Sequence, residues 1–172
     1  MPNEGRVYFA LLGSDFDPEL LDLGVRPTET RRRGNPRPKH SSWIFSTERV
    51  VADVVDIYSM SSAVIALLIP HEARIVAAMK AHKLEAVLEV VLTISPDQSV
   101  STPAIGFDAP VVSFMSRVGG SIDVDTYRGV SQLNVCDPKR PLDHERQRVN
   151  SAQSAPRAGS DPTQKAQYHD NN

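Results

Sequence analysis

Residues 84–94, LEAVLEVVLTI, are the stretch that decides the fold. They are mostly aliphatic and rich in valine, and polar residues interrupt them at positions 85, 89 and 93. Side chains point alternately to the two faces of a sheet, so the pattern predicts a strand with one buried and one partly wet face. Ala86, Leu88, Val90 and Leu92 are expected on the buried face, and Glu85, Val87, Glu89, Val91 and Thr93 on the other.

The flanking sequence predicts further strands and helices around this strand. Strands are expected at residues 6–12, 42–46, 104–107 and 121–127. Helices are expected at residues 17–24, 48–68, 70–82 and 108–118, the first and last opened by an aspartate with a proline just behind it. The predicted fold class is α+β: a two-layer sandwich with helices on one face of a largely antiparallel sheet, built from two β-α-β-like halves.

Length and composition predict one domain followed by a tail. The chain has 172 residues, of which 40% are hydrophobic, which is enough for one core. From about Asp137 the aliphatic residues nearly vanish, and such a segment buries too little surface to offset its ordering entropy. The prediction is a single domain over residues 3–135 and a disordered C-terminal tail over residues 136–172.

Charge and cysteine content limit which cellular compartment and which kinds of partner are expected. A formal net charge of -2 gives no overall field toward nucleic acid or an acidic membrane. The single cysteine, Cys136, excludes an internal disulfide and a zinc site built on a cysteine pair. The start shows no export pattern, and the apolar run 63–69 is far shorter than the ~20 residues of a membrane span. A cytoplasmic protein without membrane contact is expected.

The densest positive cluster follows the first predicted helix. It comprises Arg31, Arg32, Arg33, Arg37 and Lys39. Arginine fits carboxylate and phosphate with its planar fork, so an anionic partner is one interpretation. No aromatic residue stands among the arginines to stack on bases, which disfavours nucleic acid. A solvated loop is the simplest interpretation, an acidic protein surface is the second and nucleic acid is the third.

Two aspartate pairs are the other candidates. Asp123 and Asp125 share one face of a predicted strand, where carboxylates oppose edge-to-edge pairing. Asp15 and Asp17 precede a predicted helix and are interpreted as its cap. A magnesium or calcium site needs several converging oxygens, which the spacing does not supply, so no metal and no cofactor are expected. No catalytic triad or phosphate loop is evident either.

The order of these pieces resembles a bacterial family catalogued as domain of unknown function 4279. The similarity covers roughly residues 7–127, from YFALLGSDFDPELLDLGVRPTETRRRGNPR through SSWIFST to FDAPVVSFMSRVGGSIDVDTY. The matching positions are Asp15, Asp17, Pro18, Leu23, Gly24, Pro27, Thr28, Arg33, Gly34, Trp43, Asp123, Asp125 and Tyr127. The middle, residues 51–69, departs from the family pattern because it is unusually rich in valine, serine and alanine. The resemblance implies a small cytoplasmic protein and no established reaction.

These observations predict a non-catalytic protein-binding domain, one form of which is an immunity-type partner of a toxin. The expected contact residues are Arg31, Arg32, Arg33, Arg37, Lys39, Asp123 and Asp125, and the expected partner is an acidic protein. One alternative is a hydrolase or metal-dependent enzyme, which requires Asp15 and Asp17 to meet the other aspartate pair in one pocket. Another alternative is a nucleic-acid-binding protein.

Overall fold

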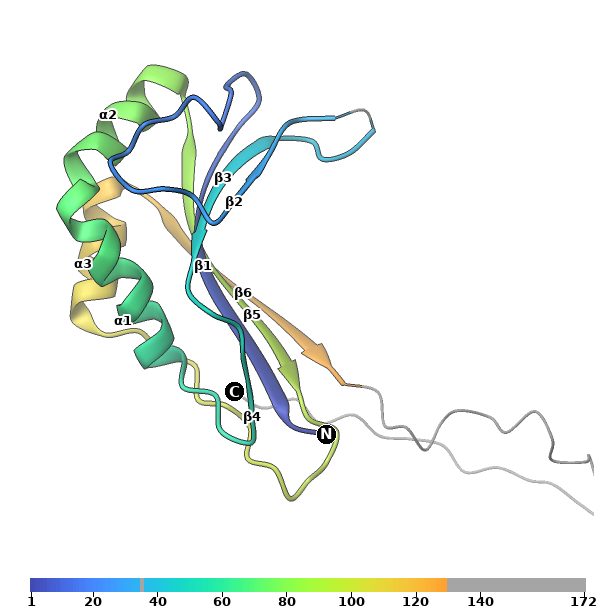
Figure 1. Ribbon diagram of the computed structural model, residues 1–172. Helices are drawn as coiled ribbons and strands as arrows, with labels where there is room; N and C mark the ends of the chain where they lie inside the picture. Colours follow the sequence, from blue (N-terminus) through green and yellow to red (C-terminus); the bar gives the residue numbers. More distant parts are fainter. Residues whose placement is uncertain (35, 130–172) are drawn as a thin grey trace, which may run out of the picture. The chain divides into compact units, whose positions relative to one another are not determined.

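The computed structural model describes residues 1–34 and 36–129. This part of the chain forms a six-stranded sheet with the strand order β2-β3-β1-β5-β6, and β4 pairs with the first part of β1. Helices α1, α2 and α3 lie against one face of the sheet, so the structure has two layers (Figure 1). The predicted α+β class is confirmed.

The strand β1 (Asn3–Gly13) is the centre of the sheet. It pairs antiparallel with β3 (Ser41–Ser46), β4 (Val50–Ala52) and β5 (Glu85–Ile94). The edge strand β2 (Glu29–Arg31) pairs antiparallel with β3. Of the described strands, only β6 (Ser121–Arg128), at the other edge, pairs parallel, with β5. A parallel neighbour needs a crossover, and α3 supplies it.

The register assigns every strand side chain to one of two faces. Phe9 lies opposite Leu88, and both are fully buried against the helices. Tyr8 lies opposite Glu89, and both side chains point to the other face and are half-buried. We call this helix-free side the open face. Its members discussed below are Arg6, Tyr8, Glu29, Arg31, Val87, Glu89, Val91, Asp123, Asp125 and Tyr127.

The helical layer begins later than the sequence predicts. Helix α1 covers Ile57–Leu68, with the Asp56 carboxylate accepting from the Ser59 backbone N–H at 3.2 Å. The expected start at residue 48 is wrong because residues 50–52, rich in valine, pair with β1 as β4. The predicted break at Pro70 is confirmed as a single turn of 3-10 helix, η1 (Ile69–His71), before α2 (Glu72–His82).

The helical run from residue 57 to residue 82 is apolar. By length and composition alone it is long enough to cross a membrane, a criterion that core helices of soluble proteins also meet. Its inner side packs on the sheet through buried residues such as Val64, Leu68 and Ile75.

Helix α3 (Ala109–Val118) forms as the sequence predicts. The Asp108 Oδ1 atom accepts from the Val111 backbone N–H at 3.4 Å, and its Oδ2 atom accepts from the Ser62 hydroxyl of α1 at 2.6 Å. Gly119 ends the helix with a φ of 71°, a backbone conformation that glycine adopts without steric cost. One aspartate therefore both starts α3 and joins it to α1.

Two predicted elements are absent from the described residues. The helix predicted at residues 17–24 does not form. The Asp17 carboxylate accepts from the Glu19 N–H at 3.1 Å in a tight turn, and the Asp22 carboxylate accepts from the Gly24 N–H at 2.9 Å. Side chains of aspartate compete for backbone groups in this way, and two helical turns are too short to persist without packing. Residues 104–107 pair with no described strand. The β-α-β form is thus realised by β5, α3 and β6, while turns replace the helix in the N-terminal half.

The core lies between the sheet and the helices. The rings of Phe9 on β1 and Phe114 on α3 meet edge to face with centroids 6.0 Å apart. Trp43 on β3 is fully buried. Its ring stacks on that of Phe45, with the ring centroids 6.4 Å apart. The predicted tail over residues 136–172 lies outside the described residues, so the boundary at residue 135 stays a prediction.

Candidate functional site

Three carboxylates converge on the open face. Asp123 and Asp125 share one face of β6, as predicted. Glu89 on β5 lies directly opposite Asp123. One oxygen of each carboxylate lies within 4.8 Å of the others. We call Glu89, Asp123 and Asp125 the acidic cluster. It has the donor chemistry to hold a hard divalent cation or a guanidinium or ammonium group.

The three carboxylates of the acidic cluster repel one another. Partial burial raises the pKa of Glu89 above its usual range, and the negative charges of Asp123 and Asp125 raise it further. In the described part of the chain, no lysine or arginine nitrogen lies within 4.0 Å of these carboxylates. Among the described residues, the repulsion between the three groups is therefore not relieved by an ion pair.

On the open face, Tyr8 lies between the acidic cluster and the two arginines Arg6 and Arg31. Burial raises the pKa of its hydroxyl, Glu89 raises it further, and Arg6 and Arg31 act in the opposite direction. The Arg6 guanidinium carbon lies 5.1 Å from the centroid of the Tyr8 ring, a cation–π distance. At the far edge, the Tyr127 hydroxyl donates to the Asp125 carboxylate at 3.3 Å. The open face thus combines aromatic rings with charges of both signs.

The first arginine of the basic run lies on the open face. The register of β2 with β3 places Arg31 there with Glu29. The Arg31 Nε atom lies 2.6 Å from the Glu29 carboxylate, and Arg6 approaches the same carboxylate at 3.4 Å. The hydrogen bond from Arg31 lowers the pKa of Glu29, so this carboxylate is held in its charged form.

The next two arginines bind the loop that follows β1. The Arg32 Nη2 atom lies 2.8 Å from Asp17 Oδ2 and 2.9 Å from Glu19 Oε2. Arg33 lies 3.8 Å from the Asp15 carboxylate. Asp15 and Asp17 are thereby ion-pair partners of arginines rather than the cap of a helix.

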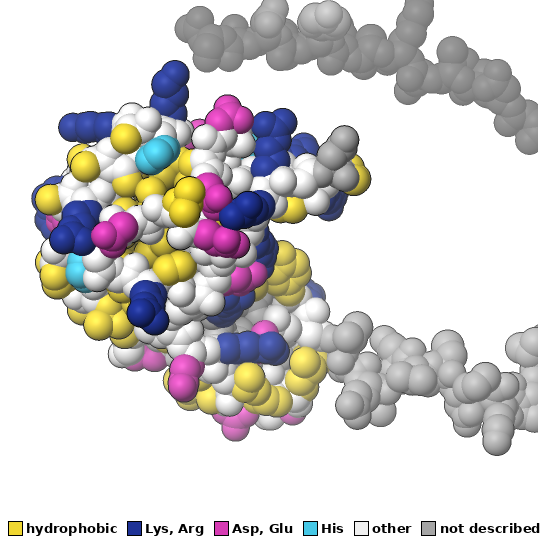
Figure 2. All heavy atoms as spheres, turned by 45° about the horizontal axis from the view of Figure 1, so that its top comes forward, with side chains coloured by type: hydrophobic (Ala, Val, Ile, Leu, Met, Phe, Trp, Pro, Cys, Tyr) yellow, Lys and Arg dark blue, Asp and Glu magenta, His cyan; other side chains and the backbone are white. Residues whose placement is uncertain are grey.

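Arg37 and Lys39 complete the predicted basic run on the exposed turn between β2 and β3. Among the described residues, neither has a carboxylate within 4.0 Å. The β2–β3 hairpin extends away from the helical layer (Figure 1). Positive and negative side chains lie close together around the hairpin (Figure 2), in agreement with the ion pairs of Arg31, Arg32 and Arg33.

The fold does not bring the two predicted aspartate pairs together. Asp15 and Asp17 follow the end of β1 and are bound by arginines of the hairpin. Asp123 and Asp125 lie on β6, and β5 separates that strand from β1. The four-carboxylate pocket that the enzyme alternative required is not formed by the described residues.

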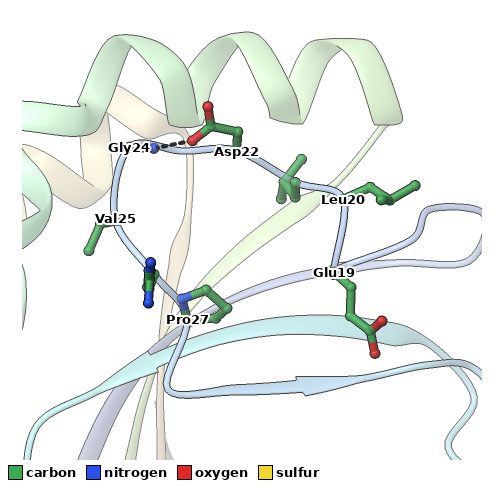
Figure 3. Close-up of a pocket in the computed structure, with 8 residues that line it drawn as sticks. Glu19, Leu20, Asp22, Gly24, Val25 and Pro27 are labelled. Atoms are coloured by element: carbon green, nitrogen blue, oxygen red, sulfur yellow. Dashed lines mark hydrogen bonds between the residues drawn. The ribbon is translucent and has the colours of Figure 1, made fainter.

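A separate hollow lies in the loop over residues 19–27. Figure 3 shows that the carboxylates of Glu19 and Asp22 point in different directions, and that the Asp22 carboxylate binds the Gly24 N–H. The hollow is lined by Glu19, Leu20, Leu21, Asp22, Gly24, Val25, Arg26 and Pro27. With its two acids apart and no histidine, serine or cysteine in its lining, it offers no pair of groups for acid–base or nucleophilic chemistry.

Seven members of the open face were not among the predicted contact residues: Arg6, Tyr8, Glu29, Val87, Glu89, Val91 and Tyr127. Alternation along residues 84–94 did place Glu89 on a partly wet face. What joins it to Asp123 is the parallel pairing of β5 with β6, and no local pattern in the sequence indicates which strands become neighbours.

The family comparison agrees with the resemblance. The family model described as "Domain of unknown function (DUF4279)" matches residues 3–129. The chain belongs to this family. The DUF4279 match spans all six strands and the whole helical layer. No curated protein and no solved structure matches the chain significantly.

Proposed function

We propose that this DUF4279 domain is a non-catalytic module that binds another protein through the open face and the adjoining β2–β3 hairpin. The observation that carries the proposal is the open face itself: a sheet face without helices that presents aromatic rings and charges of both signs. Sheets that leave one face to solvent usually make it polar, and this one adds the half-buried Tyr8, Val87 and Val91. Aromatic residues beside charges are typical of protein interfaces.

Arginine placement also supports binding. Arg6 and Arg31 share one carboxylate and are held in place before any partner arrives. A side chain ordered in advance loses less conformational entropy on association, which favours affinity. The hairpin adds Arg37 and Lys39, two exposed cations on the turn between β2 and β3.

The specific form of the proposal is an immunity-type role, in which the domain binds and neutralises a toxin made by the same cell. A neutralising partner needs surface complementarity and no reaction of its own, which fits a binding surface built from charges and rings. The cytoplasmic location expected from the sequence stays a prediction.

A photo-crosslinking experiment tests the binding surface. A crosslinking amino acid replaces Tyr127 on the open face and, in a control protein, Leu67 on α1; the two residues are equally exposed, at 54%. Each protein is co-expressed with the product of the gene adjacent to its own in the source genome. We expect a crosslinked complex from position 127 and none from position 67.

A crosslink from position 67 alone would place the binding surface on the helices and overturn the proposal. Absence of any complex, together with failure of the domain to restore growth of cells that express the adjacent product, would overturn the immunity-type form.

A further inference from the structure

We infer that the open face docks a positively charged protein surface, whose lysine or arginine side chains lie over β5 and β6. This inference deepens the proposed binding function and rests on it. It reverses the expectation from the sequence, in which the arginines pointed to an acidic partner. The reversal follows from which charges the folded chain has already paired.

Arg6, Arg31, Arg32 and Arg33 are each paired with a carboxylate of the domain, whereas among the described residues Arg37 and Lys39 on the hairpin turn are not. Arg31 and Arg6 approach Glu29, and Arg32 and Arg33 approach carboxylates of the loop after β1. At these four arginines, an acidic partner would have to compete with carboxylates already in place. Exposed ion pairs are individually weak, but the internal partners are tethered and the external ones are not.

The carboxylates on the other side of the open face have no such partner in the part of the chain that the structure describes. Glu89, Asp123 and Asp125 crowd within 4.8 Å, and no cationic side chain of the described chain is within 4.0 Å. A cation placed over them would remove mutual repulsion as well as add attraction. Like charges left together on a surface therefore favour a partner of the opposite sign.

The surroundings suit a long cationic side chain better than a small ion. Tyr127 is 54% exposed at the edge, and Val91 and Tyr8 are half-buried beside the acidic cluster. The aliphatic stems of lysine and arginine cover apolar surface while their charged ends stay near carboxylates. A sheet face of this kind offers both contacts to one side chain.

The test uses two short probes of opposite charge, a tetra-arginine and a tetra-glutamate peptide, at ~150 mM salt, where charges more than about 8 Å apart are screened. Backbone amide NMR shifts report where each probe binds. We expect the tetra-arginine peptide to perturb β5 and β6, and the tetra-glutamate peptide to leave them unchanged. Asp123→Asn with Asp125→Asn should weaken tetra-arginine binding about five- to tenfold, the effect of removing two surface charges.

A matched control pair removes two exposed carboxylates elsewhere, Glu48→Gln with Asp53→Asn, and should leave the affinity unchanged. Any of four results would overturn the inference. Two concern where and how the tetra-arginine peptide binds: equal weakening by the control pair, or shifts centred on residues 31–40. The other two are preferential binding of the tetra-glutamate peptide, and the same β5 and β6 shifts with calcium chloride alone. A partner that crosslinks at position 127 but is insensitive to Asp123→Asn with Asp125→Asn would overturn it while leaving the binding function intact.

Discussion

The side chain of Asn3 accepts a hydrogen bond from the backbone N–H of Ser95 at 2.9 Å, which ties the start of β1 to the end of β5. The Asn3 amide nitrogen donates to the backbone carbonyls of Asp53, at 2.8 Å, and Ser101, at 2.9 Å. Asn3 is fully buried. One side chain thus satisfies backbone groups of three separate segments.

Asn3→Ala should lower the free energy of unfolding by about 2–4 kcal/mol, because three buried hydrogen bonds are lost and their backbone partners are left unpaired. Urea unfolding followed by circular dichroism measures the change. Thr102→Ala, an exposed substitution in the same loop, is the control and should change stability by less than about 0.5 kcal/mol. Equal stability of the Asn3 variant would mean that water replaces the side chain.

Trp43→Ala should destabilise the domain by about 3–5 kcal/mol, because it empties the space of a fully buried indole. Trp43→Phe should cost much less, since the indole N–H has no hydrogen-bond partner among the described residues and its loss removes only packing. Circular dichroism is the readout, because Trp43 is the only tryptophan of the chain. Similar losses for both variants would show that the N–H contributes more than the ring volume.

Glu89→Gln should stabilise the domain at pH 7 and have little effect near pH 3. The pKa of Glu89 is raised in the folded state, so the folded protein binds this proton more tightly than the unfolded chain. The contribution of Glu89 to stability is therefore lost as the pH rises from the unfolded-state pKa of about 4.3 through the higher folded-state pKa. Unfolding curves across this range should show the stability of the variant, relative to the wild type, increasing with pH, and Glu48→Gln should behave as the wild type. A constant difference at all pH values would contradict the assignment.

Replacing Arg31, Arg32 and Arg33 with serine should reduce stability only modestly, because exposed ion pairs contribute about 0–1 kcal/mol each. Removing the two partners of Arg32 by Asp17→Asn with Glu19→Gln should produce a loss that is not additive with Arg32→Ser. Additive losses would show that these pairs are not coupled in solution.

The wild type should not bind random duplex DNA at about 150 mM salt, and micromolar binding there would restore the nucleic-acid alternative.

The sequence predicts best those elements whose determinants are local. The strand at residues 84–94 and helix α3, with Asp108 at its start and Gly119 at its end, are specified by alternation and by caps. Residues 17–23 carry the same kind of start signal, yet Leu20 is 82% exposed, so the leucines there do not form one buried face. A cap without an apolar face to pack gives a turn.

The candidate site is predicted less well because it depends on neighbours that are distant in the sequence. Asp123 and Asp125 follow from alternation within one strand, whereas Glu89 and Tyr8 join them only through the order of β1, β5 and β6. Likewise, the arginines of the basic run stand out by composition, but their ion pairs with residues 15, 17, 19 and 29 depend on how the loop after β1 folds back.

The central position of β1 has a consequence for biosynthesis. Strand β1 leaves the ribosome before the three strands that pair with it, and its longest partner, β5, is made only after β3, β4 and two helices have emerged. Until then one edge of β1, with its apolar RVYFALL stretch, has no strand to pair with. Nascent chains that end before about residue 94 should therefore need a chaperone most. That need should end when translation completes β5.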